Sequence, residues 1–189
     1  TTQQVSIANE TAVSTTSSGT SVSQATAAAS SSQNQSKYEA NVASVAGKMD
    51  NRVIAAYQQL GFKLVVDPSV NYSGYFDARS RSITMKQIDD SVYHELGHFL
   101  AFIAGNADKT ASFQSIFAAE KANVTAFNKA YVTQNASEYF AESVKDYILN
   151  NASLKNTRPQ TYAAVQNALN QITDAQIAKI QKIYGAFWN

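Results

Sequence analysis

The chain has 189 residues, which is enough for one compact domain with a sizeable core. Its 15 Lys and Arg residues nearly balance 14 Asp and Glu residues, and a net charge of +1 excludes the strongly basic surface of most nucleic-acid-binding proteins. The absence of Cys excludes disulfide bonds and thiolate metal sites, and the longest apolar run, Phe99 to Ala104, is too short for a transmembrane helix.

The first 36 residues differ in composition from the rest of the chain. Seventeen of them are Ser or Thr, and Glu10 is the only charged residue among them. With so few large apolar side chains, this segment cannot offset the entropy cost of ordering itself. We predict a flexible leader or spacer over residues 1–36, of the kind common at bacterial surfaces, and a folded domain over residues 37–189. The alternative is an exposed tail of a cytosolic protein.

Residues 38–60 carry apolar side chains at every third or fourth position, which predicts one amphipathic helix ended by Gly61. A strand is expected at residues 62–66. Residues 75–86 then predict a small hairpin, because polar and apolar side chains alternate over its second strand, residues 81–86. Since the second face of that strand is polar, we expect residues 81–86 to form the edge of the sheet.

The rest of the chain has helical periodicity, and most of the predicted helices follow a polar capping residue. Asp89 or Asp90 caps a helix that runs to about Ala104 and stops at Gly105. Further helices are expected after Thr110, from Asn135 to about Leu149, after Pro159, and from Ile172 to Tyr184 with Ile177, Ile180 and Ile183 on its apolar face. A few strands followed by many helices predict a mostly helical α+β domain.

The segment His94-Glu95-Leu96-Gly97-His98 contains both His residues of the chain. On a helix, residues four positions apart lie on one face, so both imidazoles can bind a single metal ion. Glu95 then faces the open side of that ion, where it can act as general base toward a water molecule. This HExxH pattern predicts one Zn²⁺ per chain. The alternative, two His in a core helix without a metal, would leave buried polar groups without partners.

A zinc site that is open to substrate needs a third protein ligand, and no third His exists, so the ligand must be Asp or Glu. Glu138 and Glu142 lie four residues apart on one helical face, and two like charges there indicate a nearby cation or His. We expect Glu138 to be the third ligand; the alternative is a capping box with Asn135. Glu142 is expected to accept a hydrogen bond from a ligand His, with an ordinary surface Glu as the alternative.

These residues resemble the catalytic domain of the anthrax lethal factor family of zinc metallopeptidases. The likeness covers roughly residues 75–170 and consists of HELGH at 94–98, Tyr131, Glu138-Tyr139-Phe140-Ala141-Glu142 and Pro159-Gln160-Thr161-Tyr162. The size is closer to that of the small secreted relatives, the Pro-Pro endopeptidases. In this family the first Glu of the second segment is the third zinc ligand, and a Tyr seven residues before it faces the substrate carbonyl. The resemblance implies these roles for Glu138 and Tyr131; a half-buried aromatic is the alternative for Tyr131.

The resemblance also implies a zincin-like domain whose small sheet places its edge strand beside the HExxH helix, and an extracellular bacterial endopeptidase of the gluzincin type. We expect a monomer that binds a protein or peptide along strand 81–86 by strand addition, and no nucleic acid. The connection from Gly74 to Met85 is shorter than the Gly-rich substrate loop of the Pro-Pro endopeptidases, so cleavage between prolines is not implied. The alternatives are an intracellular HELGH peptidase that cleaves a regulator, and a binding module without turnover, against which Glu95 argues.

Overall fold

The computed structural model describes residues 36–188. The predicted leader, residues 1–36, lies outside this part of the chain apart from its last residue. Within residues 36–188, none of the helices is both long enough and apolar enough to cross a membrane. The fold is of the predicted α+β type and combines one small sheet with a larger number of helices.

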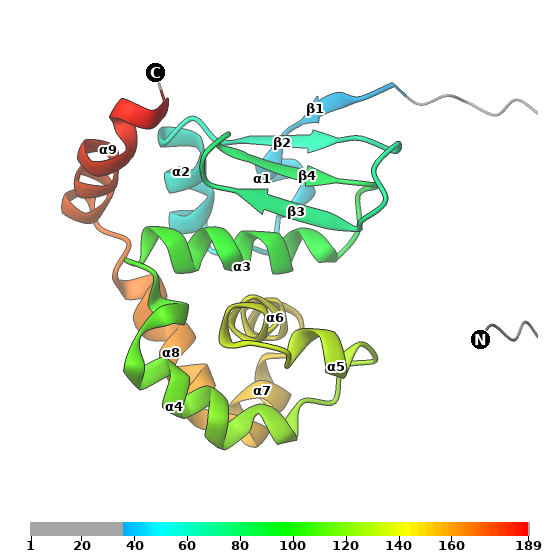
Figure 1. Ribbon diagram of the computed structural model, residues 1–189, viewed down its shortest axis with the longest axis vertical. Helices are drawn as coiled ribbons and strands as arrows, with labels where there is room; N and C mark the ends of the chain where they lie inside the picture. The colour runs from blue at the N-terminus through cyan, green and yellow to red at the C-terminus, as the bar shows by residue number, and fades with distance from the viewer. Residues whose placement is uncertain (1–35, 189) are drawn as a thin grey trace, which may run out of the picture. The chain divides into compact units, whose positions relative to one another are not determined.

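Four short strands form one mixed sheet in the order β1-β2-β4-β3 (Figure 1). The strands are β1 (Tyr38–Ala40), β2 (Lys63–Val66), β3 (Gly74–Asp77) and β4 (Ser82–Met85). β2 and β4 run parallel, whereas β1 and β3 pair antiparallel with β2 and β4, respectively. The predicted hairpin is confirmed, with Gly74 opposite Met85 and Asp77 opposite Ser82.

The prediction that residues 81–86 form the edge strand is wrong, because β4 is paired on both sides and β3 lies at the edge. The alternating pattern itself is present: Ile83 and Met85 are fully buried, whereas Ser82 and Thr84 are half-buried on the other face. Alternation shows which face of a sheet is covered, but it carries no information on which strand has a free edge. The strand beside the HExxH helix is β3.

The single helix predicted over residues 38–60 is also wrong. The segment is divided into β1, the short helix α1 (Val42–Val45) and the longer helix α2 (Asn51–Gln59). Asn41 and Asp50 cap these helices with side-chain oxygens that accept backbone N–H hydrogen bonds. Both helices turn apolar residues toward one core, so the apolar spacing does not distinguish two short helices from one long helix.

The helices predicted after Asp89 or Asp90, after Thr110 and after Asn135 begin there, whereas the helices at residues 129–132 and 151–157 are not among the predicted ones. Asp89 and Thr110 accept hydrogen bonds from the backbone N–H groups of Ser91 and Phe113, and Asn135 accepts one from Glu138. The helices are α3 (Ser91–Ile103), α4 (Ala111–Glu120), α5 (Lys129–Val132), α6 (Ala136–Leu149), α7 (Asn151–Thr157), α8 (Pro159–Asn170) and α9 (Asp174–Trp188), with short 3-10 helices at Ala107–Lys109 and Lys121–Asn123.

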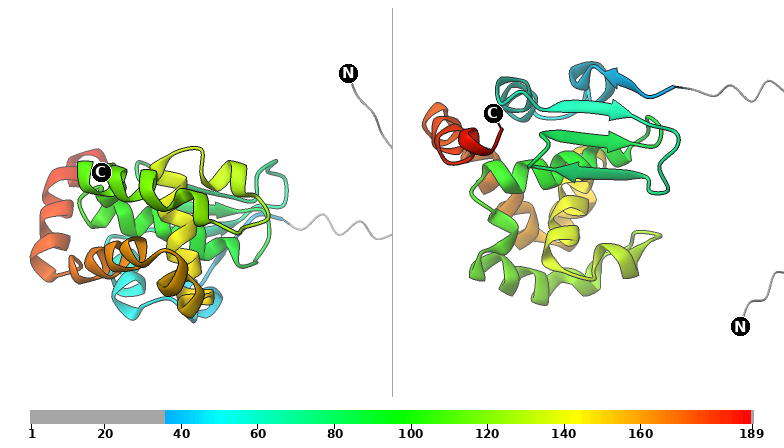
Figure 2. Two further views of the ribbon diagram at one scale, coloured as in Figure 1. Left: turned by 90° about the horizontal axis from the view of Figure 1, so that it is seen from below. Right: turned by 45° about the horizontal axis from the view of Figure 1, so that its top comes forward.

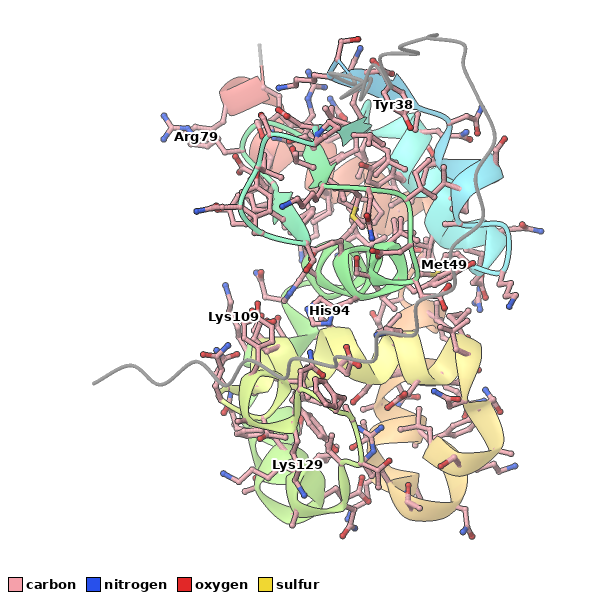
Figure 3. All side chains as sticks on the ribbon, turned by 90° about the vertical axis from the view of Figure 1, so that its right-hand side faces the viewer. Tyr38, Met49, Arg79, His94, Lys109 and Lys129 are labelled. Atoms are coloured by element: carbon pink, nitrogen blue, oxygen red, sulfur yellow. The ribbon has the colours of Figure 1, made fainter. Side chains whose placement is uncertain are left out.

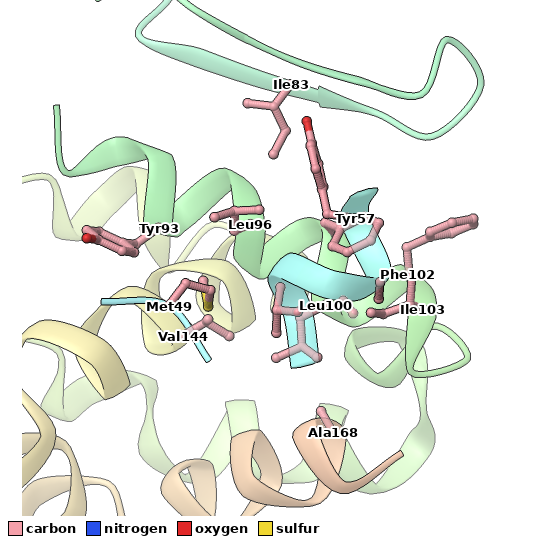
Figure 4. Packing of buried hydrophobic residues seen from close by; sticks show 14 of the residues in the cluster. Met49, Tyr57, Ile83, Tyr93, Leu96, Leu100, Phe102, Ile103, Val144 and Ala168 are labelled. Carbon is pink, nitrogen blue, oxygen red and sulfur yellow. The ribbon is translucent and has the colours of Figure 1, made fainter. Parts of the chain in front are cut away.

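Helix α3 lies against the sheet on one side and against α6 on the other (Figures 1 and 2). It contributes Leu96, Leu100 and Ile103 to a core that also contains Ile83 of β4 and Val144 of α6 (Figure 4). Helices α4, α7 and α8 in turn pack on α6. The HExxH segment is therefore carried by a buried helix that lies between the sheet and α6.

The C-terminal helix α9 lies beside the turn that joins β3 to β4 (Figure 1). Trp188, the only Trp of the chain, donates a hydrogen bond from Nε1 to the carbonyl oxygen of Ala78 in this turn, at 2.9 Å. Arg81 donates to the carbonyl oxygen of Trp188 at 3.3 Å and lies over its ring. Ile183, predicted on the apolar face of α9, is 49% exposed. The end of α9 thus holds the β3–β4 hairpin, and with it the edge strand β3, in place.

Helices α3 and α6 approach so closely that only a glycine fits where they cross. A Cβ atom added to Gly97 would lie 2.7 Å from both the Cα atom and the carbonyl oxygen of Ala141. These are backbone atoms of a buried helix, and they cannot yield unless α6 shifts as a whole. The glycine within HELGH is therefore a packing requirement of the α3–α6 pair.

The substitution Gly97→Ala tests this requirement. An Ala in an exposed helix stabilises the helix by about 1 kcal/mol relative to Gly, but overpacking at the crossing should reverse the sign and cost about 1–3 kcal/mol. Urea unfolding of the metal-free protein measures this difference. Gly185→Ala in α9 is the matched control, because its added Cβ would meet only the Gln181 side chain at 3.5 Å. Equal stability of the two variants would contradict the close crossing.

Candidate metal centre

Helix α3 presents His94 and His98 on the side that faces α6, with ring centroids 5.0 Å apart. Figure 3 shows His94 between the ribbon of α3 and that of α6. The side chains of His94 and His98 are only 9% and 17% exposed. Because successive turns of one helix carry the two rings, their separation is fixed by the backbone of α3.

Glu138, in the first turn of α6, reaches both imidazoles. Its Oε2 atom lies 3.1 Å from Nε2 of His94 and 3.6 Å from Nε2 of His98. Asn135 also accepts a hydrogen bond from the Glu138 backbone N–H, as a capping residue does. The two interpretations of Glu138 are therefore compatible, since its backbone is capped while its carboxylate lies against the His pair.

Glu142 lies one turn further along α6 and contacts the other nitrogen of His94. The distance from its Oε2 atom to Nδ1 of His94 is 2.9 Å, and its Oε1 atom accepts a hydrogen bond from Nζ of Lys145 at 3.3 Å. The Glu142 side chain is only 7% exposed. It therefore fixes the orientation of the His94 ring from behind, which is how a carboxylate supports a metal-binding imidazole.

The carboxylates and imidazoles shift one another's proton affinity. Burial alone would lower the pKa of His94, but hydrogen bonds with Glu138 and Glu142 outweigh it and raise this pKa to about 9. Burial would also raise the pKa of Glu138, yet the two His hold it well below its usual value. The metal-free cluster is therefore a protonated His94 between two carboxylates, and a divalent cation would compete with the proton on Nε2.

Glu95, the next residue of α3 after His94, is buried and lies against the edge strand. A Cβ atom added to Gly74 at the start of β3 would lie 2.7 Å from Cγ and Oε1 of Glu95, so the absence of a side chain at Gly74 leaves room for this carboxylate. Burial raises the pKa of Glu95, while His94 and His98 act in the opposite direction and leave a net increase. Such a carboxylate has the properties of a general base.

Two cavities meet at Glu95, and both are lined by Gly74 and Tyr131. The larger, of about 340 Å³, extends past His94 and is called the His94 cavity. The smaller, of about 180 Å³, extends past His98 and is called the His98 cavity. A wider cavity of about 540 Å³ between α4 and α8 does not reach any of these residues. The site is thus a cleft with β3 on one side and α5 and α6 on the other.

Tyr131 of α5 stands at the mouth of this cleft. Its ring centroid lies 6.5 Å from that of His94, and the residue is 53% exposed. Burial and the nearby carboxylate of Glu138 raise the pKa of Tyr131, so its hydroxyl keeps its proton at neutral pH. A protonated phenol at this position can donate a hydrogen bond into the cleft.

His94, His98 and Glu138 together could hold a metal ion. Their ligand atoms lie within 4.8 Å of one another, and no other such group occurs in residues 36–188. Two imidazoles and one carboxylate are the donors that zinc and similar divalent ions take in catalytic sites, where a fourth position stays open. The donor set therefore fits a catalytic metal.

Three residues that the structure brings to the site were not recognised in the sequence. Gly74 and Gly97 are needed for close approach to Glu95 and to α6, and a lone glycine gives no signal of such a contact. Lys145 lines the His94 cavity. A signal for Lys145 did exist, because it follows Glu138 and Glu142 on the same helical face at a spacing of seven and three residues.

Comparison with known protein families finds a match over the middle of the chain. Residues 78–168 match the sequence model of a protein family described as the anthrax toxin lethal factor, N- and C-terminal domain. The matched stretch includes the HExxH segment and residues 131–142, whereas β1, β2, β3 and α9 lie outside it. A search among curated proteins finds no match. The match supports a relationship of this stretch with the lethal factor family.

Two substitutions test whether Glu138 or Glu142 is the third protein ligand of the metal ion. Glu138→Gln removes a charged donor from the ion, so one-to-one Zn²⁺ binding measured by calorimetry should be lost or weakened far more than 100-fold. Glu142→Gln can still accept the hydrogen bond from His94, and its affinity should fall by only about 10–100-fold. Both variants keep the Asn135 cap, so their unfolding curves serve as controls. The reverse order of affinities would make Glu142 the ligand.

Proposed function

We propose that this chain is a secreted zinc-dependent endopeptidase that hydrolyses peptide bonds in protein substrates. The observation that carries the proposal is the position of Glu95, a buried carboxylate placed between a two-His, one-Glu cluster and the edge strand of a cleft. The match of residues 78–168 with the lethal factor family supports the same chemistry. The Ser- and Thr-rich N-terminal segment supports an extracellular location.

His94, His98 and Glu138 would hold the zinc ion, which when bound supplies a Lewis acid that polarises a carbonyl oxygen and acidifies water. Glu142 keeps the Nδ1 proton of His94 in a hydrogen bond, so that Nε2 is the nitrogen available to the ion. Each of these side chains is held by α3 or α6, and the site therefore needs no large rearrangement to bind a metal.

Glu95 and Tyr131 perform the proton transfer and the charge stabilisation. Glu95 takes the proton of the attacking water and delivers it to the leaving amine, a role that its raised pKa favours. Tyr131 donates a hydrogen bond to the oxygen that becomes negative as the carbonyl is attacked. The Tyr131 residue is half-exposed at the mouth of the cleft, where a substrate can reach it.

The substrate is expected to lie along β3 rather than along residues 81–86. Among residues 36–188, no strand pairs with the outer edge of β3, and Gly74 within it brings the strand against Glu95. An extended peptide that adds to this edge would form backbone hydrogen bonds, and its scissile carbonyl would then pass over the site. Affinity would come from the backbone, and selectivity from the two cavities.

The variant Glu95→Gln tests the assignment of the base. Because the amide keeps the size of the side chain but cannot take a proton, turnover of a synthetic peptide library should fall at least about 10²-fold. Zinc content, measured by elemental analysis, should stay at one ion per chain. Wild-type turnover in this variant would show that Glu95 is not the base, and a zinc-loaded wild-type protein that cleaves no peptide would refute the proposed function.

The variant Tyr131→Phe tests the role of the hydroxyl. Loss of one donor to the developing oxyanion should lower kcat by about 10²-fold with little change in KM, because the hydrogen bond strengthens only in the transition state. Tyr72→Phe is the matched control, since Tyr72 also lines the His94 cavity but lies away from Glu138. Equal effects in both variants would indicate that Tyr131 only shapes the cleft.

A further inference from the structure

The two cavities of the cleft differ in charge. Among the described residues, Lys145 is the only Lys or Arg that lines either of them, and it belongs to the His94 cavity. The same cavity is also lined by the carboxylates of Glu95 and Glu142 and by Ser91, Asn128 and Tyr72, so Lys145 is what distinguishes its charge from that of the His98 cavity. The His98 cavity is smaller and is lined by aromatic residues and by Glu95 and Glu138. The cleft is therefore asymmetric about Glu95.

The ammonium group of Lys145 has more N–H donors than it uses within the described residues. Within residues 36–188 it makes one hydrogen bond, to Oε1 of Glu142 at 3.3 Å, and an ammonium group has three N–H donors. The Lys145 side chain is 28% exposed, compared with 7% for Glu142. Glu142 in turn directs its other oxygen to His94 at 2.9 Å, so its charge is shared between two partners. Two donors of Lys145 remain for a ligand in the cavity.

On the basis of the proposed function, we infer that Lys145 determines specificity by binding a carboxylate side chain of the substrate. The preferred substrates are peptides with Asp or Glu beside the scissile bond, on the side that enters the His94 cavity. A volume of about 340 Å³ admits such a side chain, whereas the cavity of about 180 Å³ favours a small residue on the other side.

The direction of the edge strand indicates on which side of the bond the acidic residue lies. Tyr72, Ser73 and Gly74 line the His94 cavity, and Gly74, Tyr75 and Phe76 line the His98 cavity, so β3 runs from the first to the second. A peptide paired antiparallel with β3, the slightly more stable arrangement, runs the opposite way. Its acidic residue then follows the scissile bond.

A purely structural role would make Lys145 a helix-surface partner of Glu142, three residues away. That role would affect the rate for all peptides alike, through Glu142 and His94. Specificity is a ratio between substrates, and a residue that acts only on the metal centre leaves such a ratio unchanged. The test therefore measures the ratio.

The experiment profiles cleavage of a synthetic library of peptides with randomised positions by mass spectrometry, using wild type, Lys145→Met and Lys145→Glu. Wild type should favour Asp or Glu at one position. Lys145→Met should remove this preference, and Lys145→Glu should turn it toward Lys or Arg. For two peptides that differ only by Glu or Lys there, the ratio of kcat/KM should change by at least about tenfold. Lys182→Glu, an equal charge change at an exposed position of α9, should keep the wild-type ratio.

Each outcome bears on the inference separately from the proposed function. Cleavage without an acidic preference, or with the same ratio in both Lys145 variants, would overturn the role of Lys145 and leave the peptidase proposal standing. An acidic preference before the bond that depends on Lys145 would support the role and reverse the direction of the peptide. If no variant cleaves, binding of the same two peptides to zinc-loaded Glu95→Gln, followed by fluorescence anisotropy, decides: equal affinities would overturn the inference.

Discussion

The crossing of α3 and α6 at Gly97 and Ala141 is the constraint on which the site depends. His94 and His98 stand three residues before and one residue after Gly97, and Glu138 and Glu142 stand in the same positions around Ala141. When the two backbones touch at the crossing, the flanking pairs have to meet. A larger residue at position 97 would separate the helices. The carboxylates of Glu138 and Glu142 would then move away from the imidazoles of His94 and His98. The cluster is thus defined by the four-residue spacing of the two His, the four-residue spacing of the two Glu, and the contact between the two helices.

Meeting in the core is costly for four ionisable groups, and the cluster offsets this cost internally. The two carboxylates lie on opposite sides of His94, at 3.1 and 2.9 Å, so the imidazole separates charges that would otherwise repel. In residues 36–188 no buried side-chain nitrogen or oxygen lacks a hydrogen-bond partner. The metal-free site therefore has its hydrogen bonds satisfied, contrary to the expectation that a buried His pair without a metal would leave polar groups without partners. His94, His98 and Glu138 would hold a cation there, while Glu142 would keep its contact with Nδ1 of His94.

The sequence was most informative where chemistry requires a fixed spacing on one element. The HExxH segment and the Glu138–Glu142 pair are local patterns, and the capping residues Asp89, Thr110 and Asn135 gave the starts of their helices. Strand order and contacts between elements could not be predicted from the sequence in the same way. Which strand lies at the edge depends on strand order, and alternation over residues 81–86 could not report it. Close approaches at Gly74 and Gly97 are likewise properties of pairs of elements.

The proposed chemistry and the proposed substrate recognition lie on different sides of the boundary of the family match. The proposed ligands and the base all lie in α3 and α6, within the stretch that matches the lethal factor family. The edge strand β3 lies outside that stretch, and it is held in place by α9 through Trp188, which also lies outside it. Because an edge strand contributes backbone groups whatever its side chains are, it can vary in sequence while the ligand set stays the same. Lys145 is the exception, since it belongs to the ligand-bearing face of α6 and also lines the cleft. In the proposed mechanism, a change of substrate charge preference at this position has to remain compatible with Glu142. Selectivity would therefore be coupled to the metal site more tightly than it would be if it depended on β3.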